Sequence, residues 1–272
     1  YTPAGIDALA KAVADRGAPE PLPVHLKVDT GMHRVGAAPA DALALARRIN
    51  EHGELRLEGV WTHLAVADEP DNPYTGEQLT KFEAVLSELA AAGVRPPLVH
   101  AANSAGLLTA ARPYCNLVRA GIAIYGVPPA AALEGRAGLR PVLALKARVS
   151  HVKELPAGAR ISYGLTYALD GPGRVATVPI GYADGVPRNL GAAGGVVLVR
   201  GRRHRIAGTI TMDQLMVDVG DEPVEPGDEV VLIGRQGDAE VRATEWAERL
   251  GTIAYEIVCG IGPRAPRVYV DG

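Results

Sequence analysis

The chain has 272 residues, 47% of them hydrophobic, which is enough for one large domain or two ordinary ones with a substantial core. A formal charge of −3 argues against nucleic acid or an anionic membrane surface as a partner, and no apolar run is long enough to span a membrane. Two widely separated cysteines without metal-ligand spacing, and the lack of a secretory leader pattern, predict a cytoplasmic protein with no metal site.

The first half of the sequence alternates strand and helix patterns. Short apolar runs predict strands at residues 23–29, 59–65, 97–102 and 117–126. Apolar residues at helical spacing predict helices at residues 40–50 and from about residue 79 to Gly93. Strands that alternate with helices indicate a parallel sheet, and four such units are half of a (β/α)8 barrel. The pattern therefore predicts an α/β fold in which residues 1–135 form a partial (β/α)8 barrel.

From about Pro141 the sequence becomes rich in β patterns, with turn residues at short intervals. Strands are predicted within residues 144–152, 174–182, 195–201, 204–210, 214–219 and 229–234. A helix is clearly predicted only at 244–250, with Thr244 as N-cap and Gly251 just past its end. Residues 136–272 are therefore predicted to form a mainly β domain of barrel or sandwich type, with the boundary in an irregular stretch at 128–140.

Polar residues gather at the ends of the predicted strands in the first half. They are Lys27, Arg34, His63, Asn103, Ser104 and Arg119. In barrel enzymes the active site is built from such positions, at the carboxyl ends of the strands. A single histidine or Asn-Ser pair there is more often structural, so the prediction of a site depends on their convergence. Lys27 interrupts a strand that a parallel barrel should bury, which is unfavourable unless the amine pairs with Asp29 or becomes neutral.

Nine short segments carry a resemblance to a known family. They are HLKVDTGMHRVG (25–36), WTHLA (61–65), HAANSAG (100–106), VRAGIAIYG (118–126), ISYGLTY (161–167), PIGYADG (179–185), TMDQ (211–214), LIGRQGD (232–238) and TIAYE (252–256). They occur in consistent order over nearly the whole chain, so the resemblance does not depend on any single motif. Together they resemble the C-terminal portion of an alanine racemase, a fold-type III pyridoxal-phosphate (PLP) enzyme. The resemblance implies that the barrel part is the C-terminal half of a TIM-type barrel.

The resemblance implies a set of cofactor contacts. Arg119 matches the arginine that faces the pyridine nitrogen of PLP, Arg34 the arginine near its phenolic oxygen, and His63 a histidine beside the ring. Further cofactor contacts, most of them at the phosphate, match Asn103, Ser104, the backbone of Gly121 and Ile122, and Tyr255. An arginine can only donate a hydrogen bond, which keeps the pyridine nitrogen unprotonated and weakens the cofactor as an electron sink.

The resemblance also implies catalytic and substrate contacts. Tyr163 matches the base that acts in the partner subunit's site, which implies a homodimer. Tyr182 and Met212 match residues at the active-site entrance and the substrate pocket. Lys27 matches a lysine that is often carbamylated, and a carbamate there would pair with Arg34. Racemisation needs proton exchange on both faces of the α-carbon, for which the family uses the tyrosine and a Schiff-base lysine.

The family's Schiff-base lysine lies in a segment resembling V-K-A-N-A-Y-G-H, which these residues lack. The five lysines are Lys11, Lys27, Lys81, Lys146 and Lys153, and none has a matching context. We therefore expect a portion of an alanine racemase that needs an N-terminal segment held elsewhere, with doubtful activity alone. The predicted function is PLP-dependent interconversion of L- and D-alanine, a small-molecule substrate, for peptidoglycan synthesis.

Three alternatives stay open on the sequence. A serine or broad-specificity amino-acid racemase is one, because a pocket that differs by a methylene or a hydroxyl discriminates only modestly. A lysine-less, non-catalytic binding module is the second. A basic-amino-acid decarboxylase shares the two-domain plan, but the segments at 25–36 and 161–164 favour the racemase.

Overall fold

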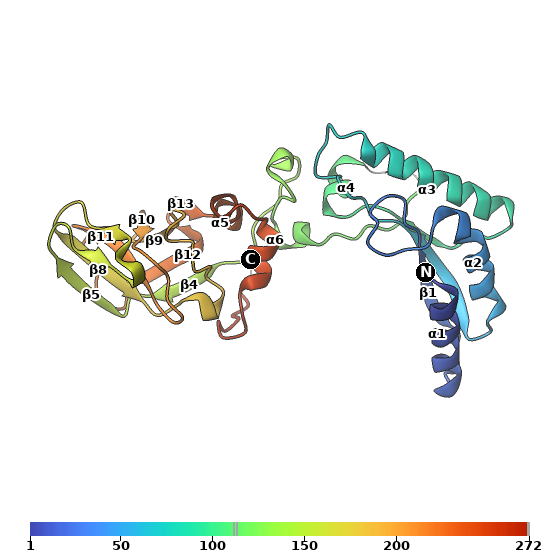
Figure 1. Ribbon diagram of the computed structural model, residues 1–272, viewed down its shortest axis with the longest axis horizontal. Coiled ribbons are helices and arrows are strands. Elements are labelled where there is room, and N and C mark those ends of the chain that lie inside the picture. Colours follow the sequence, from blue (N-terminus) through green and yellow to red (C-terminus); the bar gives the residue numbers. More distant parts are fainter. Residues whose placement is uncertain (111, 113, 271–272) are drawn as a thin grey trace. The chain divides into compact units, whose positions relative to one another are not determined.

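The computed structural model describes residues 1–110, 112 and 114–270. The chain forms two compact units (Figure 1). Unit 1 consists of residues 1–124 and 128–139, and unit 2 of residues 125–127 and the chain from Arg140 onward. Among the described residues, no helix combines the length and the apolar composition needed to cross a membrane.

Unit 1 is built on a parallel sheet in the order β1-β2-β3. The strands are β1 (Leu22–Lys27), β2 (Leu55–Trp61) and β3 (Leu98–His100), and the helices between and around them are α1 (Pro3–Asp15), α2 (Ala42–Glu51), α3 (Tyr74–Ala91) and α4 (Ser104–Thr109). Short 3-10 turns occur at η1 (Pro39–Asp41), η2 (Ile122–Tyr125) and η3 (Ala131–Leu133). Helix α2 packs on β1, β2 and α3, and Val28, Val60 and Phe82 are fully buried in the common core. The predicted α/β arrangement is confirmed.

The predicted strand at 117–126 is wrong. The backbone amides of Asn116 and Arg119 do donate to the carbonyls of Val99 and Ala102, both at 3.0 Å, so the chain runs beside the end of β3. The next amides are taken by a side chain instead of a strand. Those of Gly121 and Ala123 donate to the Ser104 hydroxyl at 2.9 and 3.3 Å, and the chain turns into η2.

Unit 2 is mainly β, as predicted. Its large sheet has the order β13-β12-β9-β10-β11-β8-β5, with β4 also paired to β12, and every pair in it is antiparallel. The strands are β4 (Leu145–Arg148), β5 (His151–Leu155), β8 (Gly173–Val178), β9 (Val196–Val199), β10 (Arg202–Ile206), β11 (Leu215–Gly220), β12 (Glu229–Gln236) and β13 (Ala239–Val241). A separate two-stranded ribbon joins β6 (Arg160–Ile161) to β7 (Tyr167–Ala168).

Two helices follow the sheet of unit 2. The predicted helix is α5 (Ala243–Leu250), and Gly251 ends it in the left-handed conformation, as expected. The prediction of Thr244 as N-cap is wrong, because Arg242 holds the extended backbone of the N-cap position and the helix begins at Ala243. Helix α6 (Ala254–Gly260) was not predicted, since its seven residues are too few to show a helical repeat.

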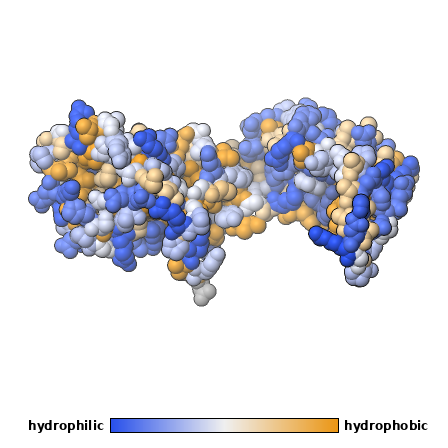
Figure 2. Space-filling view, turned by 60° about the horizontal axis from the view of Figure 1, so that its bottom comes forward, coloured by the Kyte–Doolittle hydropathy of each residue, from blue (hydrophilic) through white to orange (hydrophobic). Residues whose placement is uncertain are grey.

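Large hydrophobic side chains also reach the surface of both units, where Figure 2 shows them among hydrophilic residues. In unit 2, Tyr163 is 69% exposed, Met212 53% and Ile253 59%. Exposed apolar groups of this size often mark surfaces that contact a partner or a ligand. Two of these three residues are among the predicted site residues.

Candidate functional site

Arg119 is the centre of a polar cluster at the carboxyl ends of β2 and β3. Its Nη2 donates to the carbonyls of Thr62 and Ala101 at 2.9 and 3.1 Å and approaches Nδ1 of His63 at 3.2 Å. Its Nη1 lies 2.6 Å from Nδ1 of His100. Because a guanidinium only donates, both imidazole Nδ1 atoms must be acceptors, which makes the two histidines neutral Nε2–H tautomers.

The charge state of the cluster follows from burial. Burial lowers the pKa of Arg119 to about 10, so its guanidinium stays charged at neutral pH. Burial, followed by the charge of Arg119, lowers the pKa of both His63 and His100 to about 4. Both imidazoles are therefore neutral at neutral pH, as their contacts with Arg119 require. The cluster presents one fixed cation with oriented donors.

Lys27 ends β1 and is only 5% exposed, which confirms the burial expected from its place in the strand. Its Nζ lies 4.8 Å from the centre of the Trp61 ring, and the guanidinium carbon of Arg119 lies 4.4 Å from the same ring. Burial first, and then the charge of Arg34, lower the pKa of the amine. No side-chain hydrogen bond or ion pair joins Lys27 to another described residue, so Asp29 acts on its charge only at longer range.

The loop after β1 is shaped around the Asp29 carboxylate instead. One carboxylate oxygen accepts from the backbone amides of Gly31 and His33, both at 3.0 Å, and the other lies 3.3 Å from His33 Nδ1. His33 adopts a positive φ of 54°, a conformation that this network supports. The hydrogen bonds to Asp29 therefore fix the backbone immediately before Arg34.

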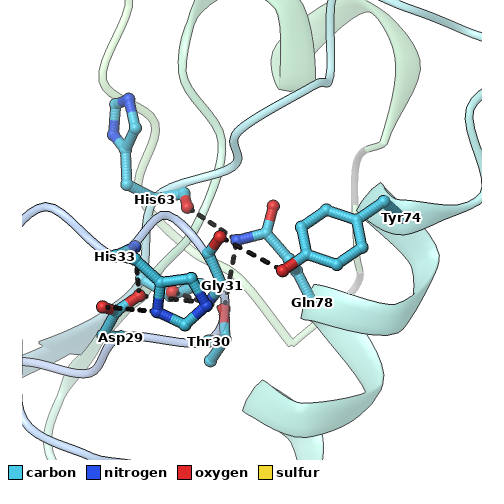
Figure 3. A network of polar contacts seen from close by, with 8 residues as sticks. Asp29, Thr30, Gly31, His33, His63, Tyr74 and Gln78 are labelled. Carbon is cyan, nitrogen blue, oxygen red and sulfur yellow. Dashed lines mark hydrogen bonds and ion pairs between the residues drawn. The ribbon is translucent and has the colours of Figure 1, made fainter.

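Helix α3 ties this loop to the loop after β2, as Figure 3 shows. Gln78 is fully buried, accepts from the amide of Ala65 at 2.8 Å and donates to the carbonyl of His63 at 3.0 Å. Tyr74 donates to the carbonyl of Gly31 at 3.2 Å. A Cβ at Gly31 would lie 2.3 Å from the Tyr74 hydroxyl, and φ there is +146°, so only glycine fits.

The third group of predicted residues lies at the start of α4. Ser104 is 2% exposed, and its hydroxyl accepts from the backbone amides of Gly121 and Ala123. Asn103 is the helix N-cap, where its side chain accepts from Gly106 at 2.8 Å and donates to the Leu64 carbonyl at 3.3 Å. The structure thus brings Asn103 and Ser104 together with the segment that begins η2.

Tyr163 occupies a tight turn in unit 2. Its neighbours Ser162 and Leu165 have positive φ values of 64° and 51°, uncommon for such residues, and Gly164 has 78°. The Thr209 hydroxyl donates to the carbonyl of Tyr163 at 2.9 Å. Unusual backbone conformations of this kind persist only where the surroundings enforce them, and here they present the Tyr163 side chain to the surface.

The segment that carries Thr209 also contacts the turn of Tyr182, another predicted site residue, and contains Met212. The amides of Tyr182 and Ala183 donate to the carbonyls of Thr211 and Met212, both at 3.0 Å. Gly181 permits this approach, because a Cβ there would lie 2.3 Å from the Thr211 carbonyl oxygen. The segment 209–212 therefore links the turns that carry Tyr163 and Tyr182. Tyr255, 37% exposed, lies in α6.

Three residues of the cluster in unit 1 had no role in the sequence prediction. His100 and Trp61 lie inside the quoted segments 100–106 and 61–65, so the resemblance could have drawn attention to them. Gln78 had no signal, since a single polar residue in a helix is ordinary. Its role depends on two loops that are distant in sequence.

Comparison with known proteins decides the family. Residues 1–129 match the family model for the N-terminal domain of alanine racemase, and residues 142–269 match the one for the C-terminal domain. The alanine racemase of Streptomyces coelicolor is 46% identical over 264 residues, which cover 95% of this chain and 67% of that protein. The chain belongs to the alanine racemase family.

Other relatives agree. The alanine racemase of Symbiobacterium thermophilum is 55% identical over 247 residues, covering 90% of this chain. The crystal structure of alanine racemase from Bacillus anthracis with bound L-Ala-P superposes with a TM-score of 0.89 at 39% identity, covering all of this chain and 69% of that one. The matched region spans 65% of the length of the Symbiobacterium protein, so this chain corresponds to about two thirds of it.

Proposed function

We propose that this chain is part of a PLP-dependent alanine racemase that interconverts L- and D-alanine for peptidoglycan synthesis. The observation that carries the proposal is the arrangement of hydrogen-bond acceptors around Arg119. Two carbonyls and two neutral imidazoles hold the guanidinium at the ends of parallel strands, where barrel enzymes place their sites. None of the described residues accepts from its Nε–H, which leaves a donor for an unprotonated pyridine nitrogen. An arginine held in this way fits the cofactor.

PLP supplies an electron sink for the removal of an α-proton from an amino acid. In this proposal Arg119 donates to the pyridine nitrogen and keeps it unprotonated, which moderates the sink and limits side reactions. Arg34 would hold the phenolic oxygen, and the neutral imidazole of His63 would contact the ring. The phosphate would be held by Ser104, the backbone of Gly121 and Ile122, and Tyr255, and Asn103 would be a further cofactor contact.

Tyr163 is proposed to hold and move the proton on one face of the α-carbon, in the site of the partner subunit of a homodimer. Its exposure of 69% and the enforced turn around it support a role in a contact outside its own unit. Tyr182 and Met212, linked to the same loop, are proposed to contact the substrate. The base for the opposite face is proposed to be a lysine outside these 272 residues, because Lys27 has another role and the other four lie in unmatched segments.

Lys27 is proposed to be carbamylated. Burial lowers the pKa of the amine, so more of it is neutral and able to add carbon dioxide. The nitrogen forms a bond to the carbon of carbon dioxide and releases one proton, which leaves an anion for Arg34 to pair with. Carbon-13 NMR after labelling with bicarbonate should show a carbamate signal that disappears in Lys27→Met.

We also propose boundaries for the two domains. Residues 1–135 would form the C-terminal half of the (β/α)8 barrel, with the three parallel strands of unit 1 as its observed part. Residues 136–272 would form the β-rich C-terminal domain. A crystal structure of the full-length protein would test both boundaries.

The test of the proposed function is the α-proton exchange of each alanine enantiomer in deuterated water. In the full-length protein with PLP, Tyr163→Phe should abolish exchange from one enantiomer and spare the other. The matched control is Tyr269→Phe, a tyrosine 93% exposed, which should exchange both enantiomers like the unmodified protein. Unchanged exchange of both enantiomers in Tyr163→Phe would show that Tyr163 is not the base. Running L-serine in parallel distinguishes an alanine racemase from one of broad specificity.

A further inference from the structure

Beyond Arg119, a row of three polar side chains crosses the parallel sheet of unit 1. His100 Nδ1 lies 2.6 Å from Arg119 Nη1, and His100 Nε2 lies 2.8 Å from Nδ1 of His25. Nε2 of His25 then faces the carboxylate of Glu58 at 3.6 Å. The two imidazoles therefore connect the Arg119 guanidinium to the Glu58 carboxylate on β2.

Two features of strand β2 permit this row: a glycine and a bulge. His25 belongs to β1 and His100 to β3, and because β2 lies between these strands, the two imidazoles meet across it. They can meet because Gly59 of β2 has no side chain, since a Cβ there would lie 2.3 Å from His25 Nδ1. The pairing of β1 with β2 shifts by one residue between Val24 and His25, which leaves Glu58 as the extra residue of a bulge beside His25.

The donors in the row have one direction. Arg119 can only donate, so Nδ1 of His100 accepts and its single proton is on Nε2. That Nε2–H must donate to Nδ1 of His25, which therefore carries no proton. The proton of His25 is left on Nε2, the nitrogen that faces Glu58. Every donor points from the cation at Arg119 towards the carboxylate, and a reversed tautomer at His100 would place two donors against each other.

We propose that His25 and Glu58 are positioning residues for Arg119, which hold His100 in the tautomer that accepts from the guanidinium and so fix the orientation of the guanidinium. His100 is 4% exposed, so its Nε2–H has no water to replace His25. The part of the proposal that concerns catalysis rests on the proposed function, in which Arg119 contacts the cofactor. The part that concerns the tautomer does not.

Two perturbations of His25 separate its position from its chemistry. Gly59→Ala adds a methyl group against the His25 ring, at a backbone conformation open to alanine, and displaces the ring without removing a polar atom. Its matched control is Gly53→Ala, whose added Cβ meets nothing within 4 Å. His25→Leu removes the acceptor, whereas His25→Asn keeps an acceptor on Cγ, where histidine has Nδ1.

The first readout is the protonation of the His100 nitrogens, measured by nitrogen-15 NMR of the histidine rings in the full-length protein. We expect a proton on Nε2 and none on Nδ1, a pattern kept in Gly53→Ala and His25→Asn. In Gly59→Ala and His25→Leu the Nε2–H should lose its hydrogen bond and its signals should shift, while Arg119 still keeps Nδ1 of His100 unprotonated. A proton on Nδ1 of His100 in the unmodified protein, or unchanged Nε2–H signals in Gly59→Ala and His25→Leu, would overturn the proposal.

The second readout is alanine racemisation. We expect kcat to fall roughly 10-fold in Gly59→Ala and His25→Leu, the size typical when a hydrogen bond behind a ligating side chain is lost, with a smaller change in KM. His25→Asn should recover most of kcat, which a merely structural role for His25 does not predict. Shifted Nε2–H signals with unchanged kcat would overturn the catalytic part. If the unmodified protein does not racemise alanine, the proposed function and the catalytic part both fail, and the NMR pattern still decides the tautomer.

Discussion

Replacement of Gln78 by leucine tests how the two loops of the site are held. Gln78→Leu replaces the amide by an apolar side chain of similar size, which leaves the Ala65 amide without its acceptor and the His63 carbonyl without its donor. An unsatisfied buried polar group is unfavourable by about 1–3 kcal/mol. Both partners are only half-buried, so water offsets part of the loss, and we expect the loop to be destabilised by about 2–3 kcal/mol in total.

Native-state amide hydrogen exchange measures this loss directly. Since about 1.4 kcal/mol corresponds to a factor of ten, the Ala65 amide should exchange roughly 30- to 150-fold faster in Gln78→Leu. Glu88→Leu, an exposed change on the same helix, is the control and should leave the exchange of Ala65 unaltered. If Ala65 exchanged at the same rate in Gln78→Leu, the argument that α3 holds this loop would be refuted.

Two further predictions concern stability. Gly31→Ala should destabilise the protein to chemical denaturation by about 1–3 kcal/mol, because φ is +146° and the new Cβ would lie 2.3 Å from the Tyr74 hydroxyl, whereas Gly76→Ala in α3 meets nothing and should not destabilise it. Burial and the neighbouring guanidinium lower the pKa of His63 and His100 from 6.5 to about 4, so their contribution to stability is complete above pH 6.5 and is lost as the pH falls towards 4. Denaturation midpoints measured from pH 7 to pH 4 should fall, and a midpoint that rises as the pH falls would contradict this assignment.

The sequence was sufficient for elements whose pattern is local. The apolar runs predicted β1 and β3, because a buried parallel strand needs apolar residues on both faces. The run at 59–65 indicated β2 but placed it four residues too late, since the strand is Leu55–Trp61. Lys27 could be expected to be buried and in need of a special environment from its place in such a run. Gly251 could be predicted as a helix end, since it follows a helical repeat and glycine tolerates a positive φ.

Features that depend on distant contacts could not be predicted in this way. The run at 117–126 is apolar enough for a strand, but the Ser104 hydroxyl takes the amides of Gly121 and Ala123. Thr244 was a reasonable N-cap by residue type, yet the extended backbone of Arg242 starts the helix earlier. Gln78 gave no signal at all, because its partners Ala65 and His63 become neighbours only after folding.

The most direct test of the central claim is the interconversion of L- and D-alanine by the full-length protein supplied with PLP. The two enantiomers have equal free energy, so reactions started from either one should converge on equal amounts. Chiral chromatography of both reactions over time measures this convergence. We predict that both reactions reach the same equal mixture and that racemisation by Arg119→Ala is severely slowed. A folded, PLP-bound protein that leaves both enantiomers unchanged would contradict it.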